Sequence, residues 1–207
     1  MKNPTTLFRL IELTRSQPQY GYILAEIPKA QLSDLAQHHY LVTFIAWQLA
    51  AAANRAGGEI NTEKVLEYAL VHDLGELFGG DIAMPYAQAN PPAREAAKSF
   101  ERENQKYISR FFEDGQAEVQ TLFTEVMQAT TNEALIAKIA DYVEVTQYKL
   151  YVGRLTAGDI KMARTKIEGN INKLTDAKAQ KALKAFVRTW EKELGNGKLP
   201  ELFEKSK

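Results

Sequence analysis

The chain contains no cysteine, and this absence excludes several kinds of chemistry at once. With no cysteine among its 207 residues, it can form neither disulfides nor iron–sulfur clusters, and it offers no thiolate to zinc or to a substrate. The chain also lacks an excess of charge, because 26 lysines and arginines balance 26 aspartates and glutamates. No global field therefore attracts nucleic acid or an anionic membrane, and we expect neither as a partner, although a local basic patch stays open.

Long hydrophobic runs are missing as well. The most apolar stretch, Tyr40–Ala53, is shorter than the roughly 20 residues of a membrane-spanning helix, and Thr43 and Gln48 interrupt it. The first residues, Met1–Leu13, mix polar and charged side chains where a signal peptide has an unbroken apolar segment. We therefore expect a cytoplasmic protein, and the length of 207 residues suits a single domain over 1–207.

Helical periodicity dominates the chain, and strand-like alternation is absent. Apolar residues at Leu35, Val42, Ile45 and Leu49 mark one face of a helix that Gly57 and its neighbour would end. Capping residues, prolines and glycines predict helices over about 31–55, 61–79, 91–114, 117–129, 132–153, from 159 onward, and over 176–194, with a loop over 81–90. These signals predict an all-α fold, a bundle of about seven or eight helices.

The chain has only three histidines, His38, His39 and His72. His38 and His72 fall on the inward faces of two successive expected helices. Asp73 follows His72 directly, and Glu76 lies one helical turn further, so that His72 and Glu76 are expected to share a face. Taken singly, each histidine has a structural explanation, since a histidine on an apolar face is usually a hydrogen-bonded core residue.

A further carboxylate, Asp141, lies inside an expected helix, between Ala140 and Tyr142. An ionised aspartate among apolar neighbours is costly unless a cation or hydrogen bonds compensate it. Alone, it could pair with Lys138 or Lys149 on a solvated face. As a set, however, imidazoles and carboxylates from three helices would surround one divalent ion in the core of a bundle.

In chain order these residues resemble the H…HD…D signature of the HD-domain metal-dependent phosphohydrolase superfamily. The surrounding residues narrow the resemblance. The stretch Ala36-Gln37-His38 resembles the start of the first motif. The stretch from Val71 to Glu76, followed by Gly80-Asp81-Ile82, is similar to the HD…E…GD segment of the branch that includes the 5′-deoxynucleotidases. The similarity extends over about residues 7–174, and a C-terminal helix over about 176–194 completes the expected HD domain.

The resemblance implies one divalent metal ion, which could be Mn²⁺, Co²⁺, Fe²⁺, Ni²⁺ or Mg²⁺. Its implied ligands are His38, His72, Asp73 and Asp141. Helical phase and the register of the first motif favour His38 over His39 as the ligand. His39 would then be structural or contact the substrate.

Two further carboxylates have implied roles in the reaction. Glu76 would act as general acid or base beside a water that the ion activates. Asp81 would orient that water or contact the sugar, unless it is simply a loop residue that follows a helix.

One short segment departs from the pattern of the branch. Where members carry a phosphate-holding arginine followed by a tryptophan, this chain has Gln19 and Tyr22 within Pro18-Gln19-Tyr20-Gly21-Tyr22. A glutamine is neutral and cannot form a bidentate charged clamp. Gln19 nevertheless stays a candidate substrate contact, and Arg15 is close enough in sequence to substitute for the missing arginine. Gln37 also replaces the usual acid before the ligand histidine.

The resemblance therefore implies an enzyme, a homodimer that hydrolyses the phosphomonoester of a (deoxy)nucleoside 5′-monophosphate with a metal-activated water. Two alternatives stay open. The first is an HD hydrolase for another phosphoester, such as a nucleoside triphosphate, a cyclic nucleotide or an alarmone. The second is a metal-containing HD-fold protein that binds a nucleotide or a partner without turnover, which the residue Gln19 motivates and the presence of Glu76 argues against.

Overall fold

The computed structural model describes residues 4–194, and within that range it contains nine α-helices and no strand. The α-helices are α1 (Thr5–Ile11), α2 (Leu35–Arg55), α3 (Thr62–Val71), α4 (Met84–Ala89), α5 (Pro91–Ser109), α6 (Gln116–Gln128), α7 (Asn132–Tyr151), α8 (Ala157–Ile171) and α9 (Ala177–Glu193). Five short 3-10 segments join them: η1 (Glu12–Ser16), η2 (Tyr20–Ala25), η3 (Lys29–Gln31), η4 (Leu74–Glu76) and η5 (Arg110–Gly115). The prediction of an all-α fold is confirmed, whereas residues 195–207, which the sequence assigned to the same domain, lie outside the described residues.

Side-chain caps start most of the long helices. Asp34 accepts a hydrogen bond from the Gln37 backbone N–H at 2.8 Å at the start of α2. Asp176 caps α9 as the sequence predicts, since its carboxylate accepts from the backbone N–H of Ala179 at 2.9 Å. Just beyond the other end of α2, Gly57 has a φ of 86°, a conformation that glycine adopts without strain.

One expected loop contains a helix, and two expected helix starts shift by one or two residues. The segment 81–90, expected as a loop, contains α4, because Pro85 suits a first helical turn and Asn90 both ends α4 and caps α5. The cap of α7 is Thr131 rather than Asn132. Helix α8 begins at Ala157 rather than at 159, because Thr156 and Asp159 cap each other reciprocally.

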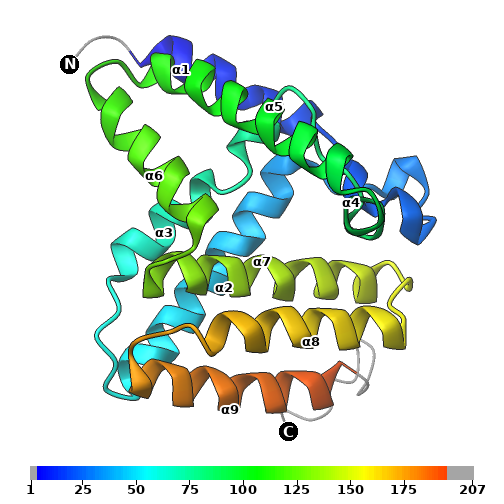
Figure 1. Cartoon of the computed structure of the whole chain (residues 1–207), viewed down its shortest axis with the longest axis vertical. Helices are drawn as coiled ribbons and strands as arrows, with labels where there is room; N and C mark the ends of the chain where they lie inside the picture. The colour runs from blue at the N-terminus through cyan, green and yellow to red at the C-terminus, as the bar shows by residue number, and fades with distance from the viewer. Residues whose placement is uncertain (1–3, 195–207) are drawn as a thin grey trace, which may run out of the picture.

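Helix α2 forms the centre of the molecule and packs against α3, α7 and α9. Helices α7, α8 and α9 lie one beside another as a layer, and α2 crosses behind them (Figure 1). Leu35, Val42 and Leu49 of α2 are buried, as their spacing predicts. Helix α2 thus faces α3 and α7 with the same buried side that carries His38.

The N-terminal segment is tied to the start of α2. The Gln19 N–H donates to the Ser33 carbonyl and the Leu35 N–H donates to the Gln17 carbonyl, both at 2.9 Å. These two bonds flank an isolated antiparallel bridge between Pro18 and Asp34. They hold the segment that carries Gln19 against the helix that carries His38.

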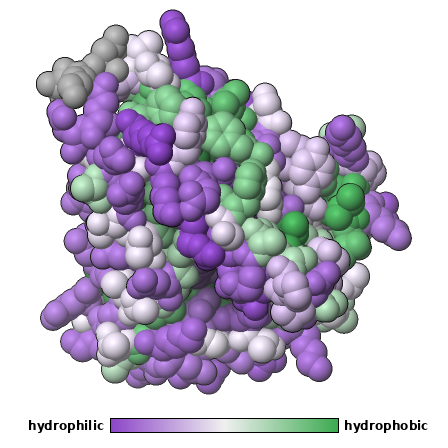
Figure 2. Space-filling view, turned by 45° about the horizontal axis from the view of Figure 1, so that its top comes forward, coloured by the Kyte–Doolittle hydropathy of each residue, from purple (hydrophilic) through white to green (hydrophobic). Residues whose placement is uncertain are grey.

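The surface is mostly hydrophilic, with local apolar areas (Figure 2). One of these areas lies at the right-hand edge of Figure 2, on the side where α4 and the segment before α2 lie in Figure 1. The exposed apolar residues Ile23 and Leu24 of η2 and Tyr86 of α4 line a shallow groove. Among residues 4–194, no helix combines the length and the apolar character that crossing a membrane requires.

Candidate metal centre and active site

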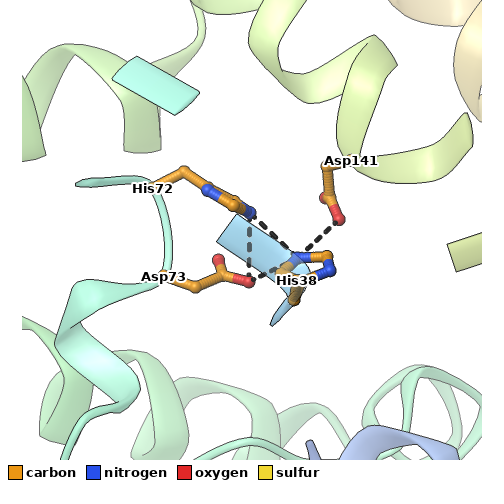
Figure 3. A group of neighbouring side chains, drawn as sticks. All are labelled: His38, His72, Asp73 and Asp141. Atoms are coloured by element: carbon orange, nitrogen blue, oxygen red, sulfur yellow. Dashed lines mark hydrogen bonds and ion pairs between the residues drawn. The ribbon is translucent and has the colours of Figure 1, made fainter. Parts of the chain in front are cut away.

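Four predicted metal ligands meet at one point (Figure 3). His38 comes from α2, Asp141 from α7, and His72 and Asp73 from the residues that follow α3. One donor atom from each lies within 4.8 Å of all the others. His38 Nε2 lies 3.1 Å from His72 Nε2, 3.4 Å from Asp73 Oδ2 and 3.6 Å from Asp141 Oδ1. Segments far apart in the sequence therefore present two imidazoles and two carboxylates to a common centre.

The chain breaks its helix where it reaches this centre. The sequence predicts one helix through His72 and Glu76, but α3 ends at Val71 and the residues Leu74–Glu76 form the separate turn η4. Asp73, with φ −114° and ψ 15°, lies between the two elements. The expectation of a shared helical face for His72 and Glu76 was therefore wrong. The break lets the side chain of Asp73 point toward the centre. In a continuous helix, that side chain would be turned about 100° away from His72.

Hydrogen-bond partners of the two Nδ1 atoms orient His38 and His72 so that each Nε2 faces the centre of the cluster. His72 Nδ1 lies 2.9 Å from the Ala69 carbonyl oxygen, which can only accept, so Nδ1 carries the proton and Nε2 is left as an acceptor. His38 Nδ1 lies 2.7 Å from Glu144 Oε2, and an ionised carboxylate likewise makes it a donor. Both Nε2 atoms and two carboxylates therefore face the centre, where a cation can replace a proton. This donor set fits a divalent cation, and the outer partners are those that metal-binding histidines have.

The carboxylates of the cluster favour positive charge at its centre, which either a proton on His38 or a bound cation supplies. Burial lowers the pKa of His38, but the hydrogen bonds to the carboxylates of Asp73 and Glu144 outweigh burial and hold that pKa well above its usual value. Burial raises the pKa of Asp73, but His72 and His38 outweigh it and hold that pKa well below its usual value. Positive charge at the centre is therefore strongly favoured.

We expect Glu144→Gln to weaken metal binding by about 10–100-fold, the usual effect of losing an outer partner of a ligand histidine. The side chain keeps its size, but the amide no longer fixes the proton of His38 on Nδ1. Calorimetric titration with Mn²⁺ measures the change. Glu118→Gln, an exposed substitution on α6, serves as the control and should leave the affinity unchanged; equal affinities for all three proteins would show that Glu144 does not support the metal.

The cluster opens into a cavity of about 270 Å³. His38, Asp73 and Asp141 line the cavity on the side of the cluster. Three other residues with predicted roles in the site also line the cavity: Gln19, Glu76 and Asp81. The predicted acid–base and sugar-side residues therefore share one space with three of the predicted ligands.

Glu76 and Asp81 hold their protons more tightly than ordinary carboxyls. Burial raises the pKa of Glu76 well above its usual value, and the nearby carboxylates of Asp73, Asp81 and Glu101 raise it further. Burial raises the pKa of Asp81 to about 6, even though its Oδ2 accepts a hydrogen bond from the Gly21 N–H at 2.5 Å. A β-carbon at position 21 would lie 2.8 Å from Asp81 Oδ1, so only glycine permits this approach.

Two other residues that we expected as substrate contacts lie outside the cavity. Arg15 is exposed and its Nε donates to Glu12 Oε2 at 2.8 Å. His39 is buried beside His72, with 5.0 Å between the ring centroids. Neither residue is among those that line the cavity.

Four residues of the site received no role from sequence reasoning, although Tyr22 was noted where the branch carries a tryptophan. Glu144 supports His38, and its one available signal was an acid three residues after Asp141 on a helix with a buried face. Tyr22 lines the cavity, as do Lys149 and Asp159, which form an ion pair of 2.7 Å between α7 and α8. No sequence spacing links Lys149 to Asp159, so nothing in the sequence could have placed this pair in the site.

Known proteins are similar to this chain in sequence or in fold. A 5′-deoxynucleotidase of Vibrio vulnificus is 33% identical over 135 residues, which cover 64% of this chain and 68% of that protein. A 5′-deoxynucleotidase of Photorhabdus laumondii is 31% identical over 130 residues, covering 61% of this chain and 64% of that protein. The structure of an HD-domain phosphohydrolase from Listeria innocua superposes with a TM-score of 0.72 at 23% identity, covering 97% of this chain and 96% of that one, and it shows the shared fold.

The match to a family model agrees with the H…HD…D order of the clustered residues. The model, described as HD domain, matches residues 24–184, a range that contains all four clustered side chains. Since this match covers most of the chain, the chain belongs to the HD-domain family.

Proposed function

We propose that the protein hydrolyses the phosphomonoester of a (deoxy)nucleoside 5′-monophosphate. The proposal assigns one divalent ion, Mn²⁺, Co²⁺, Fe²⁺, Ni²⁺ or Mg²⁺, to His38, His72, Asp73 and Asp141. The observation that carries it is the convergence of two acceptor nitrogens and two carboxylates beside a cavity that Glu76 also lines. The relatives named 5′-deoxynucleotidase support the choice of substrate.

The residues of the chain supply binding and proton transfer. When bound, a divalent ion lowers the pKa of water and offsets negative charge on the phosphate. Glu76 accepts a proton as the water oxygen bonds to phosphorus, and it returns a proton to the 5′-oxygen as the phosphorus–oxygen bond breaks. Its raised pKa suits this exchange, because a carboxyl that titrates closer to neutral pH can both accept and donate.

The remaining groups of the cavity hold the substrate. Asp81, fixed by the Gly21 N–H, orients the water or contacts the sugar. Of the three substrate contacts expected from the sequence, only Gln19 lines the cavity, so the proposal rests on Gln19 rather than on Arg15 or His39. The apolar groove of Ile23, Leu24 and Tyr86 shares Asp81 with the cavity, and it offers apolar surface to a nucleobase.

A panel of phosphoesters tests the proposal. Release of inorganic phosphate is measured with Mn²⁺ or Co²⁺ from nucleoside and deoxynucleoside 5′-monophosphates, a nucleoside triphosphate, a cyclic nucleotide and an alarmone. We expect turnover of the monophosphates. Turnover of another phosphoester alone would replace the substrate, and no turnover of any would favour a protein that binds without reaction. A single domain over 1–207, a homodimer, a cytoplasmic location and the absence of nucleic-acid partners stay predictions.

A further inference from the structure

Helix α5 holds the turn η4, which connects the metal cluster to Glu76. Asn104 of α5 is buried, and its Nδ2 donates a hydrogen bond to the carbonyl oxygen of Gly75 at 2.7 Å. Among residues 4–194, no backbone N–H donates to this oxygen. Because a buried carbonyl needs a hydrogen-bond partner, Asn104 supplies the one that the turn itself does not.

The close approach of α5 to the turn requires a glycine at position 75. A β-carbon there would lie 2.6 Å from Glu101 Cγ and 3.0 Å from the Glu101 carbonyl oxygen. Since the second of these atoms belongs to the backbone of α5, the helix or the turn would have to shift to admit a larger residue. Gly75 therefore allows the approach, and Asn104 forms the hydrogen bond across it.

One planar peptide group links this contact to Asp73 and Glu76. The Gly75 carbonyl and the Glu76 N–H belong to the same peptide group, whose atoms lie in one plane. That N–H donates to the Asp73 carbonyl oxygen at 2.9 Å. The peptide is thus held at both ends, by Asn104 at its carbonyl and by Asp73 at its N–H. Its plane sets the direction in which the Glu76 side chain leaves the backbone.

The side chains of Asp73 and Glu76 differ in what holds them. Asp73 Oδ2 lies 3.4 Å from His38 Nε2 and 3.3 Å from His72 Nε2, so contacts within the cluster fix this carboxylate (Figure 3). The Glu76 carboxyl lines the cavity, and among residues 4–194 it has no hydrogen-bond partner. The position of the Glu76 carboxyl therefore depends on its backbone, which the contact with Asn104 fixes.

We propose that Asn104 is a positioning residue for the reaction. By holding the peptide between Gly75 and Glu76, it places the Glu76 carboxyl at the distance from the metal cluster that proton transfer requires. This inference rests on the proposed function, in which Glu76 exchanges the proton. Asn104 is not among the residues that line the cavity, so its effect reaches the reaction through the turn. A displacement of about 1 Å at a reacting group can lower a rate by about 10²-fold.

Replacing Asn104 by leucine gives the first test, because leucine has a similar shape but no donor. We expect kcat for phosphate release to fall by about 10–100-fold, since Glu76 loses its fixed backbone. KM and the affinity for Mn²⁺ should change by less than about threefold, because the metal ligands and the cavity wall are unaltered. Gln105→Met is the matched control and should leave kcat unchanged, since Gln105 is also buried on α5 but donates to Glu101 Oε1. A loss of kcat in both variants, or in neither, would overturn the inference.

A double-mutant cycle distinguishes positioning from a general loss of stability. In the Glu76→Gln protein, Asn104→Leu should lower kcat by less than about threefold, because a residue that acts only through Glu76 has no further effect once the carboxyl is gone. All rates are measured well below the melting temperature of each variant. Two independent effects would multiply, so a full additional loss in the double variant would overturn the inference and leave the function standing.

Amide hydrogen exchange followed by NMR gives a test that needs no substrate. In Asn104→Leu, the Glu76 N–H should exchange about tenfold faster or more than in Gln105→Met, because the turn opens more easily without the bond to Gly75. Unchanged exchange would overturn the inference even in an active enzyme. Faster exchange in a protein that turns over no phosphoester would support the hold of Asn104 on the turn and would overturn the proposed function instead.

Discussion

Replacing Glu76 by glutamine is expected to lower kcat by about 10²–10⁴-fold, the range that a positioned general acid or base contributes. The amide keeps the shape of the side chain but can no longer take or give the proton. Because Glu76 lines the cavity without belonging to the clustered donors, metal content should stay at the level of the unmodified protein. Phosphate release and elemental analysis of the same samples measure both quantities.

Glu101→Gln is the matched control for this experiment. Glu101 raises the pKa of Glu76 through its charge, but it is not among the residues that line the cavity. Its replacement removes a negative charge from the same neighbourhood and should change kcat by less than about tenfold, since no proton donor is lost. A similar loss in both variants would mean that the local field, rather than a proton held by Glu76, governs the rate.

Replacing Asp141 by alanine is expected to remove both metal and activity. Asp141 supplies one of the two carboxylates that offset a divalent charge, and the remaining donors are two neutral imidazoles and Asp73. The affinity for Mn²⁺ should fall by more than the roughly 100-fold that an outer partner costs. The rate should fall by about 10³-fold or more, because a bound ion contributes several kcal/mol to the transition state.

We expect Asp141→Ala to fold normally. A loss of metal and activity can then be attributed to the missing carboxylate. Circular dichroism should show unchanged helical content, since the side chain of Asp141 is partly exposed to the cavity and replaces no core packing. Asp114→Ala, an exposed change in η5, should leave metal and activity unaffected. Full activity in Asp141→Ala with added Mn²⁺ would show that Asp141 is not a ligand.

Much of the site could be predicted because His38 and Asp141 lie on long periodic helices and His72 directly follows another. The spacing of Leu35, Val42 and Leu49 indicates which face of α2 is buried, and His38 lies on that face. The order of His38, His72-Asp73 and Asp141 then carried the family resemblance, and the structure brings these side chains together. The pattern was informative because helical phase is set by local sequence.

The rest depends on features that a single sequence does not encode locally. The break after Val71 places Asp73 in the cluster, yet its residues read as a continuing helix. The pair of Lys149 and Asp159 forms because α8 packs on α7. The burial of Gln19 and Tyr22 depends on hydrogen bonds to Ser33 and Asp81, which are distant in sequence.

The most direct measurement of the central claim is the metal content of the protein, purified without chelators and analysed for transition metals. We predict about one divalent ion per chain, since a single cluster of four donors was found among the described residues, and loss of that ion in His72→Ala. The absence of metal from the unmodified protein, even after incubation with Mn²⁺ or Co²⁺, would contradict the assignment of a metal-dependent phosphohydrolase.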